Sequence, residues 1–193
     1  IPVELHSAFV HTAQQTSADV QAMQTHYHFV CGPVDLTLTF TAPLFMDQLD
    51  LLSRPVNYLT YQVSSRDGEA HDVELYFEAA PSWALNQACQ PCTSRGFEED
   101  GMVFLQSGSK AQDILAKRGD DLRIDWGYFY LMAAKEHTQY GVGSRRALRH
   151  AFLCGEVGKQ AKMGEDRSAT LALVRSYGQV KSLTDKILLG YDD

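Results

Sequence analysis

The sequence predicts an all-β protein, an antiparallel two-sheet β-sandwich with one or two short helices in its loops. Apolar residues recur with a period of two from Val34 to Ala79, which is typical of strands that bury one face. Several short runs of this kind follow at roughly 8 to 12-residue spacing with turn residues between them, which favours a sandwich over alternating βαβ units. No internal repeat or composition break divides the chain, so a single domain over 1–193 is expected.

Two strands and a hairpin are predicted between residues 25 and 41. The run 34–41 places four apolar side chains on one face: Val34, Leu36, Leu38 and Phe40. The run 25–31 alternates in the same way, with Tyr27 and Phe29 on one face. Gly32-Pro33 separates the two runs and predicts a hairpin turn between them.

A second pair of strands is predicted at 58–63 and 72–78. Asp67-Gly68 lies between them, and these residues tolerate the positive φ of a tight turn, so the two strands are expected to be antiparallel neighbours. The preceding connection, 47–55, ends at a proline that disfavours helix at residue 54. Three leucines of this connection are expected to tuck under the sheet: Leu49, Leu51 and Leu52.

The second half of the chain is expected to combine short strands, two helices and loops. In chain order we expect a long loop at 80–100, a strand at 102–105, a helix at 109–119, a central strand covered on both faces at 123–132, a helix at 144–154, a polar loop at 158–168, and closing strands at 170–174 and 186–191. Each helix has a serine N-cap and a glycine stop: Ser109 with Gly119, and Ser144 with Gly155. The stretch 3–15 is expected to be a strand or an irregular entry.

Charge and composition argue against two classes of partner. The 24 acidic and 17 basic residues give a net charge of -7, which would repel a phosphate backbone, so nucleic acid is not expected as a partner. No apolar run approaches the ~18 residues of a membrane helix, so no membrane span is expected. The chain opens with Ile1-Pro2 and lacks an initiator methionine, so we expect an upstream signal peptide, a preceding domain or both to have been removed.

The four cysteines leave the redox compartment open, because they permit three pairings if all are oxidised: Cys31, Cys89, Cys92 and Cys154. Cys89 and Cys92 have the CxxC spacing of half a zinc site or a redox pair. No second pair at matching spacing accompanies them. A local disulfide or two plain thiols is therefore the favoured interpretation.

No residue of the sequence is assigned a catalytic, cofactor-binding or metal-binding role. His26 and His28 share one strand face and could present two imidazoles to a metal, but no third ligand is identifiable. They are interpreted as solvated histidines, with a metal-dependent enzyme as the weaker alternative. Ser107 and Ser109 lie in no G-x-S-x-G motif, so nucleophilic catalysis has no local signature.

Three further groups of side chains are interpreted as structural. The aromatic residues of the strand at 123–132 could form a sugar-stacking platform but are interpreted as core: Trp126, Tyr128 and Tyr130. The acidic run Glu98-Glu99-Asp100 lacks the alternating ligands of a calcium loop and is interpreted as a solvated loop. Three arginines of the helix at 144–154 are interpreted as its solvated face: Arg145, Arg146 and Arg149.

Several long motifs resemble the N-terminal domain of the glutaminase A family, secreted enzymes of fungi and bacteria. The motifs are LTLTF, DLLSRPVNYLTY and SRDGEAHDVELYF within 34–78, Ala84-Leu85-Asn86, GDDLRIDWGYFYL at 119–131 and the terminal LLGYDD. The resemblance covers most of the chain, from about Gln15 to Asp193. The sequence departs from the family pattern at Gly32-Pro33, where Gly-Gly is common, and at Cys89 to Cys92.

The resemblance implies a β-sandwich that precedes a helical, six-hairpin glycosidase-like toroid, which is thought to carry the glutamine-hydrolysing site. This chain would then be one domain of a larger multidomain hydrolase, secreted or periplasmic, that acts on a carbon-nitrogen amide bond. No catalytic residue of the family maps onto this chain. The expected function is a non-catalytic domain that packs against the helical catalytic domain of the same polypeptide and supports it.

The rival hypothesis is a free-standing carbohydrate-binding module, based on the sandwich fold and four aromatic residues: Trp83, Trp126, Tyr128 and Tyr130. Under the leading hypothesis the isolated chain exposes an apolar interdomain face and forms a homodimer through it. The loop around Trp83 and the closing strand Ile187 to Tyr191 are the expected contributors to that face.

Overall fold

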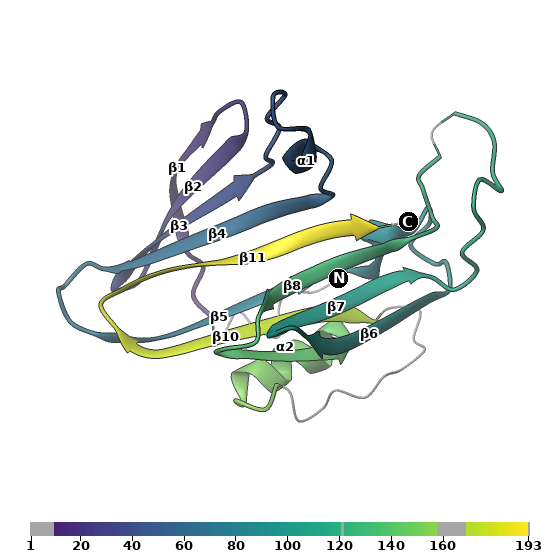
Figure 1. Ribbon diagram of the computed structural model, residues 1–193. Coiled ribbons are helices and arrows are strands. Elements are labelled where there is room, and N and C mark those ends of the chain that lie inside the picture. The colour runs from purple at the N-terminus through teal and green to yellow at the C-terminus, as the bar shows by residue number, and fades with distance from the viewer. Residues whose placement is uncertain (1–9, 121, 158–168, 193) are drawn as a thin grey trace.

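The computed structural model describes residues 10–120, 122–157 and 169–192, which form two antiparallel β-sheets packed face to face (Figure 1). The predicted all-β sandwich is confirmed. The described strands of the large sheet run, in spatial order, β1 (Gln14–Val20), β2 (Gln24–Cys31), β3 (Val34–Thr41), β4 (Val56–Ser65), β11 (Ser182–Asp192), β8 (Tyr128–Ala134), β7 (Met102–Ser109) and β6 (Cys92–Glu99). Those of the small sheet are β5 (His71–Ala79), β10 (Thr170–Val180) and β9 (Thr138–Gly143). The helical elements are α1 (Leu49–Leu52), the 3₁₀ helix η2 (Pro81–Ala84) and α2 (Arg145–Leu153).

The core lies between the two sheets and is built by alternation along the strands. Inward side chains of both sheets are at most 2% exposed: Leu59, Tyr61, Leu105, Leu131, Leu171, Leu173 and Ile187. The β2–β3 hairpin forms as predicted, with Gly32 at φ 61° in its turn. The closing strands are also confirmed, and both are longer than predicted.

β4 and β5 are not neighbours, which corrects the predicted hairpin. β4 pairs with β3 and β11 in the large sheet, whereas β5 pairs with β10 in the small sheet. The turn between them is tight, since Gly68 has φ 81° and the Asp67 carboxylate accepts a hydrogen bond from the Glu69 N–H at 3.0 Å. A turn residue reverses the chain but does not determine the sheet in which the next strand pairs.

The β10–β11 connection crosses between the sheets at the same corner, beside the β4–β5 connection. The Ser65 N–H donates to the Lys181 carbonyl at 2.8 Å, which ties the two crossings together. A buried arginine reinforces this region: Arg175 of β10 is 2% exposed and forms an ion pair with Asp185 of β11. Its guanidinium also donates to the hydroxyls of Tyr61, at 3.3 Å, and Tyr177, at 3.2 Å.

The prediction of one long loop at 80–100 is wrong, because residues 92–99 form strand β6. β6 pairs with β7 through a turn in which Asp100 and Gly101 have positive φ values of 47° and 75°. The inward position Gly96 has no side chain, and a Cβ there would lie 2.6 Å from the ring of Tyr140 on β9. Because small and polar residues face the core in this strand, it lacks the apolar alternation that identified the others.

The helix predicted at 109–119 is absent, and that segment forms turns. Ser109 Oγ accepts a hydrogen bond from the Gln112 N–H at 3.1 Å, as an N-cap would, but Gln112 and Leu115 both have φ 51°, which a helix cannot accommodate. The second helix is confirmed as α2, with Ser144 Oγ accepting from the Ala147 N–H at 3.2 Å. The predicted loop at 158–168 lies outside the described residues.

Three other expectations require correction. Leu49 does not tuck under the sheet but is 70% exposed on α1. The strand predicted at 123–132 begins only at Tyr128, although β8 is central in the large sheet, between β11 and β7. The edge strand β1 was not predicted, because all its residues are exposed and it has no buried face to produce a period. Part of the stretch 3–15 lies outside the described residues.

Candidate functional site

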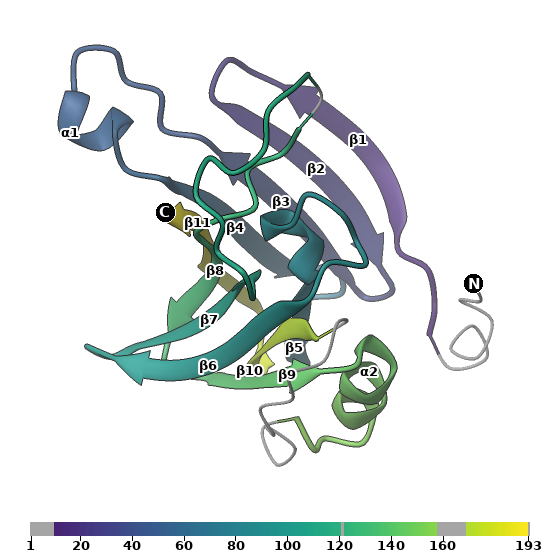
Figure 2. The ribbon, with the colours of Figure 1, turned by 90° about the vertical axis from the view of Figure 1, so that its right-hand side faces the viewer.

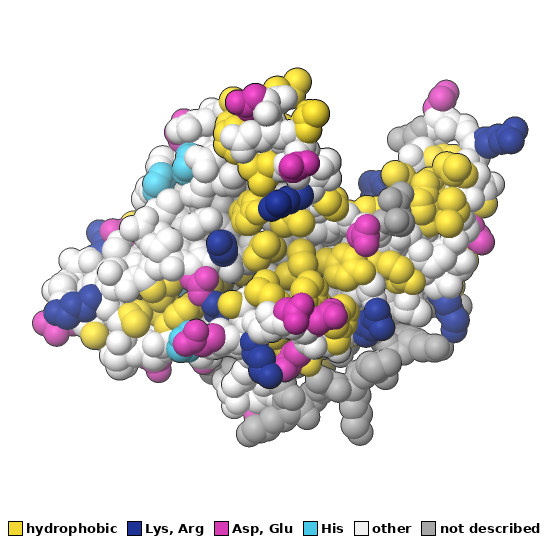
Figure 3. Space-filling view, viewed as in Figure 1, with side chains coloured by type: hydrophobic (Ala, Val, Ile, Leu, Met, Phe, Trp, Pro, Cys, Tyr) yellow, Lys and Arg dark blue, Asp and Glu magenta, His cyan; other side chains and the backbone are white. Residues whose placement is uncertain are grey.

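The outer face of the large sheet divides into a polar half and an apolar half. Across β2, β3 and β4 most outward side chains are polar, among them His26, His28, Thr37, Thr39, Thr60 and Gln62. Across β11, β8, β7 and β6 five half-buried residues form what we call the apolar half-face: Leu188, Met132, Tyr130, Phe104 and Phe97. Figure 3 shows apolar side chains gathered over β11, β8 and β7. An antiparallel sheet with one solvated face is normally polar on that face, so the apolar half-face is unusual.

Stacked rings and hydrogen bonds fix the side chains of the apolar half-face. Phe97 and Phe104 stack across strands with ring centroids 5.2 Å apart and planes 8° apart. The Arg95 guanidinium lies 5.0 Å above the Phe97 ring and donates to Gln106 Oε1 at 2.6 Å. Gln106 in turn donates to the Tyr130 hydroxyl. The surface is therefore ordered without a partner.

This arrangement corrects the core interpretation of Trp126, Tyr128 and Tyr130. Tyr128 and Tyr130 point outward, on the opposite side of β8 from the buried Phe129 and Leu131, and are half-buried. Trp126 precedes the strand and is also half-buried. Within β8 the aromatic run therefore contributes Phe129 and Leu131 to the core, and Tyr128 and Tyr130 to the outer face.

Two apolar projections rise from one end of the sandwich, and both are seen at the top in Figures 1 and 2. One is the connection that carries α1, with four exposed residues: Leu44, Phe45, Met46 and Leu49. The other is the loop 110–127, also with four: Ile114, Leu115, Leu122 and Ile124. Exposed fractions reach 81% at Met46 and 74% at Leu115. Clusters of this kind on a surface mark interaction sites.

A buried carboxylate anchors the loop 110–127. Asp125 is 3% exposed and forms an ion pair with Lys117 of the same loop. It also accepts a hydrogen bond from Gln90 at 2.6 Å, and its backbone carbonyl accepts one from Ser109 Oγ. The Lys117 ammonium and then the Gln90 amide hold the pKa of Asp125 below its usual range, so the carboxylate is ionised at neutral pH.

Replacing Asp125 by asparagine should loosen the loop, because Lys117 loses its counter-charge. We expect trypsin to cleave after Lys117 or Arg118 several-fold faster in Asp125→Asn, since cleavage requires local opening. The rates are measured by mass spectrometry under native conditions. Asp113→Asn is the matched control, because Asp113 is exposed in the same loop and its carboxylate has no hydrogen bond within the described chain. Equal cleavage of the two variants would contradict the anchoring role.

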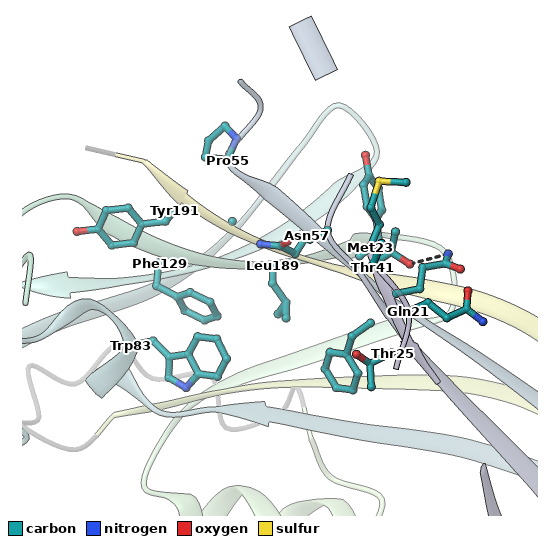
Figure 4. Close-up of a pocket in the computed structure, with 16 residues that line it drawn as sticks. Gln21, Met23, Thr25, Thr41, Pro55, Asn57, Trp83, Phe129, Leu189 and Tyr191 are labelled. Atoms are coloured by element: carbon teal, nitrogen blue, oxygen red, sulfur yellow. Dashed lines mark hydrogen bonds between the residues drawn. The ribbon is translucent and has the colours of Figure 1, made fainter. Parts of the chain in front are cut away.

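A groove of about 640 Å³ opens at the same end of the sandwich (Figure 4). It is formed by the β1–β2 turn, the end of β3, the start of β4, η2, and the facing residues of β8 and β11. Five aromatic residues line it: Phe40, Tyr58, Trp83, Phe129 and Tyr191. Its principal polar lining is Gln21, Gln24, Thr25 and Asn57. None of the lining residues is charged. The groove is therefore suited to a neutral occupant.

Trp83 is the most exposed ring of this groove. It is 63% exposed, and its ring centroid lies 5.2 Å from that of Phe129 at an interplanar angle of 40°. The sequence identified Trp83 as a candidate, but placed it with three aromatic residues that lie elsewhere. Sequence reasoning missed Phe40, Asn57 and Phe129, which come from separate strands and share no local motif. No sequence signal could have grouped them.

The structure shows which of the residues expected at an interdomain face are exposed. Trp83 is exposed as expected, but Ile187 is fully buried and Leu189 is only 9% exposed, because both point between the sheets. Most of the exposed large apolar residues lie instead on the connection with α1 and on the loop 110–127. Tyr191, which lines the groove, is half-buried.

The structure gives no metal site to the candidate histidines His26 and His28 or to the pair Cys89 and Cys92 among the described residues. His26 Nδ1 and His28 Nδ1 each lie 3.0 Å from a hydroxyl of β3, on Thr39 and Thr37. Within the described residues, no group of three potential ligands could hold a metal ion. All four cysteines are thiols, so the local disulfide between Cys89 and Cys92 is not formed.

The remaining charged and hydroxyl groups serve structural contacts. Glu98 lies in strand β6 rather than in a loop, and it forms an ion pair with Lys135. Arg145 and Arg149 lie on the solvated face of α2 as interpreted, with side chains 53% and 41% exposed, and both also form ion pairs with Glu78 of β5. Arg146 is exposed and forms no ion pair among the described residues. Two serine hydroxyls are buried and hydrogen-bonded: Ser107 to Ser94, and Ser109 to the Asp125 carbonyl.

Comparison with known proteins finds a family match and one curated relative. A family model described as a domain of unknown function, DUF5127, matches residues 23–193. Glutaminase A of Aspergillus oryzae is 26% identical over 123 residues, which cover 62% of this chain and 17% of that protein. The chain thus spans less than a fifth of the length of that relative.

Two solved structures are similar at TM-scores below 0.5. One is a provisional kojibiose phosphorylase from the human microbiome, with a TM-score of 0.43 and 8% identity over 88% of this chain and 17% of that one. The other is the heparan sulfate lyase HepC from Pedobacter heparinus, with a TM-score of 0.35 and 7% identity over 96% of this chain and 22% of that one. No helix in the described residues is long and apolar enough to cross a membrane.

Proposed function

Since this chain belongs to the DUF5127 domain family, we propose that it is a non-catalytic β-sandwich domain of a glutaminase-related protein. In this proposal residues 1–193 are one domain, which precedes and supports a helical catalytic domain of the same secreted or periplasmic polypeptide. The similarity to Glutaminase A of Aspergillus oryzae supports the relationship. The small share of that protein which the chain covers supports a multidomain context.

The observation that carries the proposal is the apolar half-face together with the exposed loop 110–127 beside it. Interfaces between domains of one chain commonly bury about 600–1,500 Å², and continuous apolar patches approaching this size are uncommon on monomers. The other half of the same sheet face is polar, so the asymmetry is not a general property of the sheet. A partner domain would cover the apolar half-face and leave the polar half in solvent.

The non-catalytic role is supported by the chemistry of the surface. The apolar half-face carries no nucleophile beside a general base. The described hydroxyls considered as candidates, Ser107 and Ser109, are buried and engaged in structural hydrogen bonds. We therefore expect the isolated chain to release no ammonia from glutamine above a buffer blank. Ammonia release by protein free of contaminating glutaminase would contradict the proposal.

The docking surface is tested by self-association of the isolated chain. We expect multi-angle light scattering to show a homodimer that forms with increasing concentration, because each copy can cover the other's apolar half-face. Met132→Glu should abolish it, since a carboxylate at a desolvated interface costs several kcal/mol. Gln62→Glu is the matched control, because it adds the same charge to the polar half of the same sheet face. A monomer at every concentration, or equal dissociation by both variants, would count against this surface.

A further inference from the structure

We propose that the groove at the end of the sandwich binds a neutral saccharide, with one sugar face stacked on Trp83. Its aromatic platform lies apart from the apolar half-face, because Phe129 and Leu189 point to the inner side of the large sheet and Trp83 of η2 packs against Phe129. The inference therefore does not rest on the proposed role in domain docking. The groove volume of about 640 Å³ lies within the range of about 300–1,000 Å³ that is usual for small-molecule sites.

The charge of the lining selects the class of ligand. Charged residues make up 21% of the chain, yet none of the described residues that line the groove is charged. A charged ligand would lose its hydration there without gaining a counter-charge, which is strongly unfavourable. Free glutamine, which carries both an ammonium and a carboxylate, is thereby disfavoured, as are nucleotides and acidic sugars. An uncharged polyol meets no such penalty.

Trp83 provides a fixed platform for the apolar face of a sugar ring. The indole is 63% exposed, but the backbone that carries it is held by the buried residues Pro81 and Ala84 of η2. Phe129 supports the ring from beside it. An exposed aromatic ring on a fixed backbone loses little conformational freedom when a ligand stacks on it. This combination is what a stacking site requires.

Polar groups around the platform are available for sugar hydroxyls. The Trp83 indole N–H and the Asn57 side-chain amide make no hydrogen bond to other groups of the described chain. Figure 4 shows Trp83 and Phe129 on one side of the space, Thr25 across from them, and Asn57 with Leu189 between. Gln24 donates to Thr41 Oγ at 3.1 Å, which leaves its carbonyl oxygen as an acceptor. The groove thus pairs an apolar ring face with donors and acceptors, as a pyranose does.

The test is a titration of the chain with uncharged and charged small molecules. Binding is measured by saturation-transfer NMR and calorimetry. The neutral sugars are methyl glucoside, methyl galactoside, methyl mannoside, maltose and cellobiose, and glutamine and glucuronate are the charged comparators. We expect at least one neutral sugar to bind with a Kd on the order of a millimolar. We expect the two charged molecules to bind at least tenfold more weakly.

Two variants and two controls locate the binding. Trp83→Ala should weaken it at least tenfold and Asn57→Ala several-fold, with unchanged melting temperatures. Ile114→Ala removes an apolar side chain outside the groove, 71% exposed against 63% for Trp83, and should leave binding unchanged. Met132→Glu should also bind sugar normally, which separates this site from the docking surface. Absence of saturable binding by every neutral sugar, or binding that survives Trp83→Ala, would overturn the inference.

Discussion

Replacing Arg175 by methionine should lower the free energy of unfolding by about 3–5 kcal/mol, measured by urea denaturation with circular dichroism at about pH 7. Arg175 is 2% exposed and bridges the two sheets through Asp185 of β11 and the Tyr61 hydroxyl of β4, and it also donates to the hydroxyl of Tyr177 on its own strand. Its removal leaves the Asp185 carboxylate, whose side chain is only 28% exposed, without its counter-charge. The expected loss of stability has two parts: a buried charge without a counter-charge, and the lost hydrogen bonds.

Arg66→Met is the matched control for this substitution. Arg66 pairs with Asp35 at 3.4 Å, but both side chains are about half exposed, at 48% and 51%. Exposed ion pairs of this kind contribute about 1 kcal/mol or less, so this variant should remain close to the parent. The double variant Arg175→Met with Asp185→Leu should recover much of the loss, because no charge is then left buried. Equal costs for Arg175→Met and Arg66→Met would contradict the cross-sheet role.

The cost of losing Arg175 should depend on pH. Burial acts to raise the pKa of Asp185, but hydrogen bonds from Tyr177, the Lys186 N–H and Arg175 outweigh it, and the pKa lies below its usual value. A carboxyl with a depressed folded pKa contributes stability that is present above its unfolded pKa, about 3.9, and is lost as pH falls through the folded pKa. The difference between the parent and Arg175→Met should therefore narrow below about pH 4. A difference that stays constant down to about pH 2 would contradict this assignment.

The fold was predictable where one face of a strand is apolar and the other polar. The strands at 34–41 and 25–31 follow this pattern, and both form and pair with each other as the predicted hairpin. β6 was not predicted because Gly96 occupies an inward position under the ring of Tyr140, and a glycine contributes nothing to a hydrophobic period. β1 was not predicted because it lies at the edge with neither face buried. The hydrophobic pattern of a sequence reflects which side chains are buried. A strand with few buried apolar side chains therefore cannot be predicted from that pattern.

The candidate site was less predictable because it depends on contacts between distant segments. Trp83 and Phe129 are 46 positions apart in sequence and meet only because η2 packs against β8. The pairing of β5 with β10, rather than with β4, likewise depends on the closing of the small sheet by a strand that comes a hundred residues later. Two residues of the apolar half-face, Tyr130 and Met132, stand at even positions of the aromatic run, but the sequence alone could not show which face of that strand is covered.

Leu131→Ala should lower the free energy of unfolding by about 2–5 kcal/mol, because it opens a cavity in the middle of the inter-sheet core. Leu131 is fully buried on β8, in register between Leu105 of β7 and Leu189 of β11. Leu49→Ala makes the same chemical change on α1, where Leu49 is 70% exposed, and should change stability by no more than about 0.5 kcal/mol. Urea denaturation of both variants checks the expectation. If Leu131→Ala lowered stability as little as Leu49→Ala, the inward face of β8 would not form the packed centre of the sandwich. The assignment of the opposite side chains of β8 to the outer, apolar half-face would then be contradicted as well.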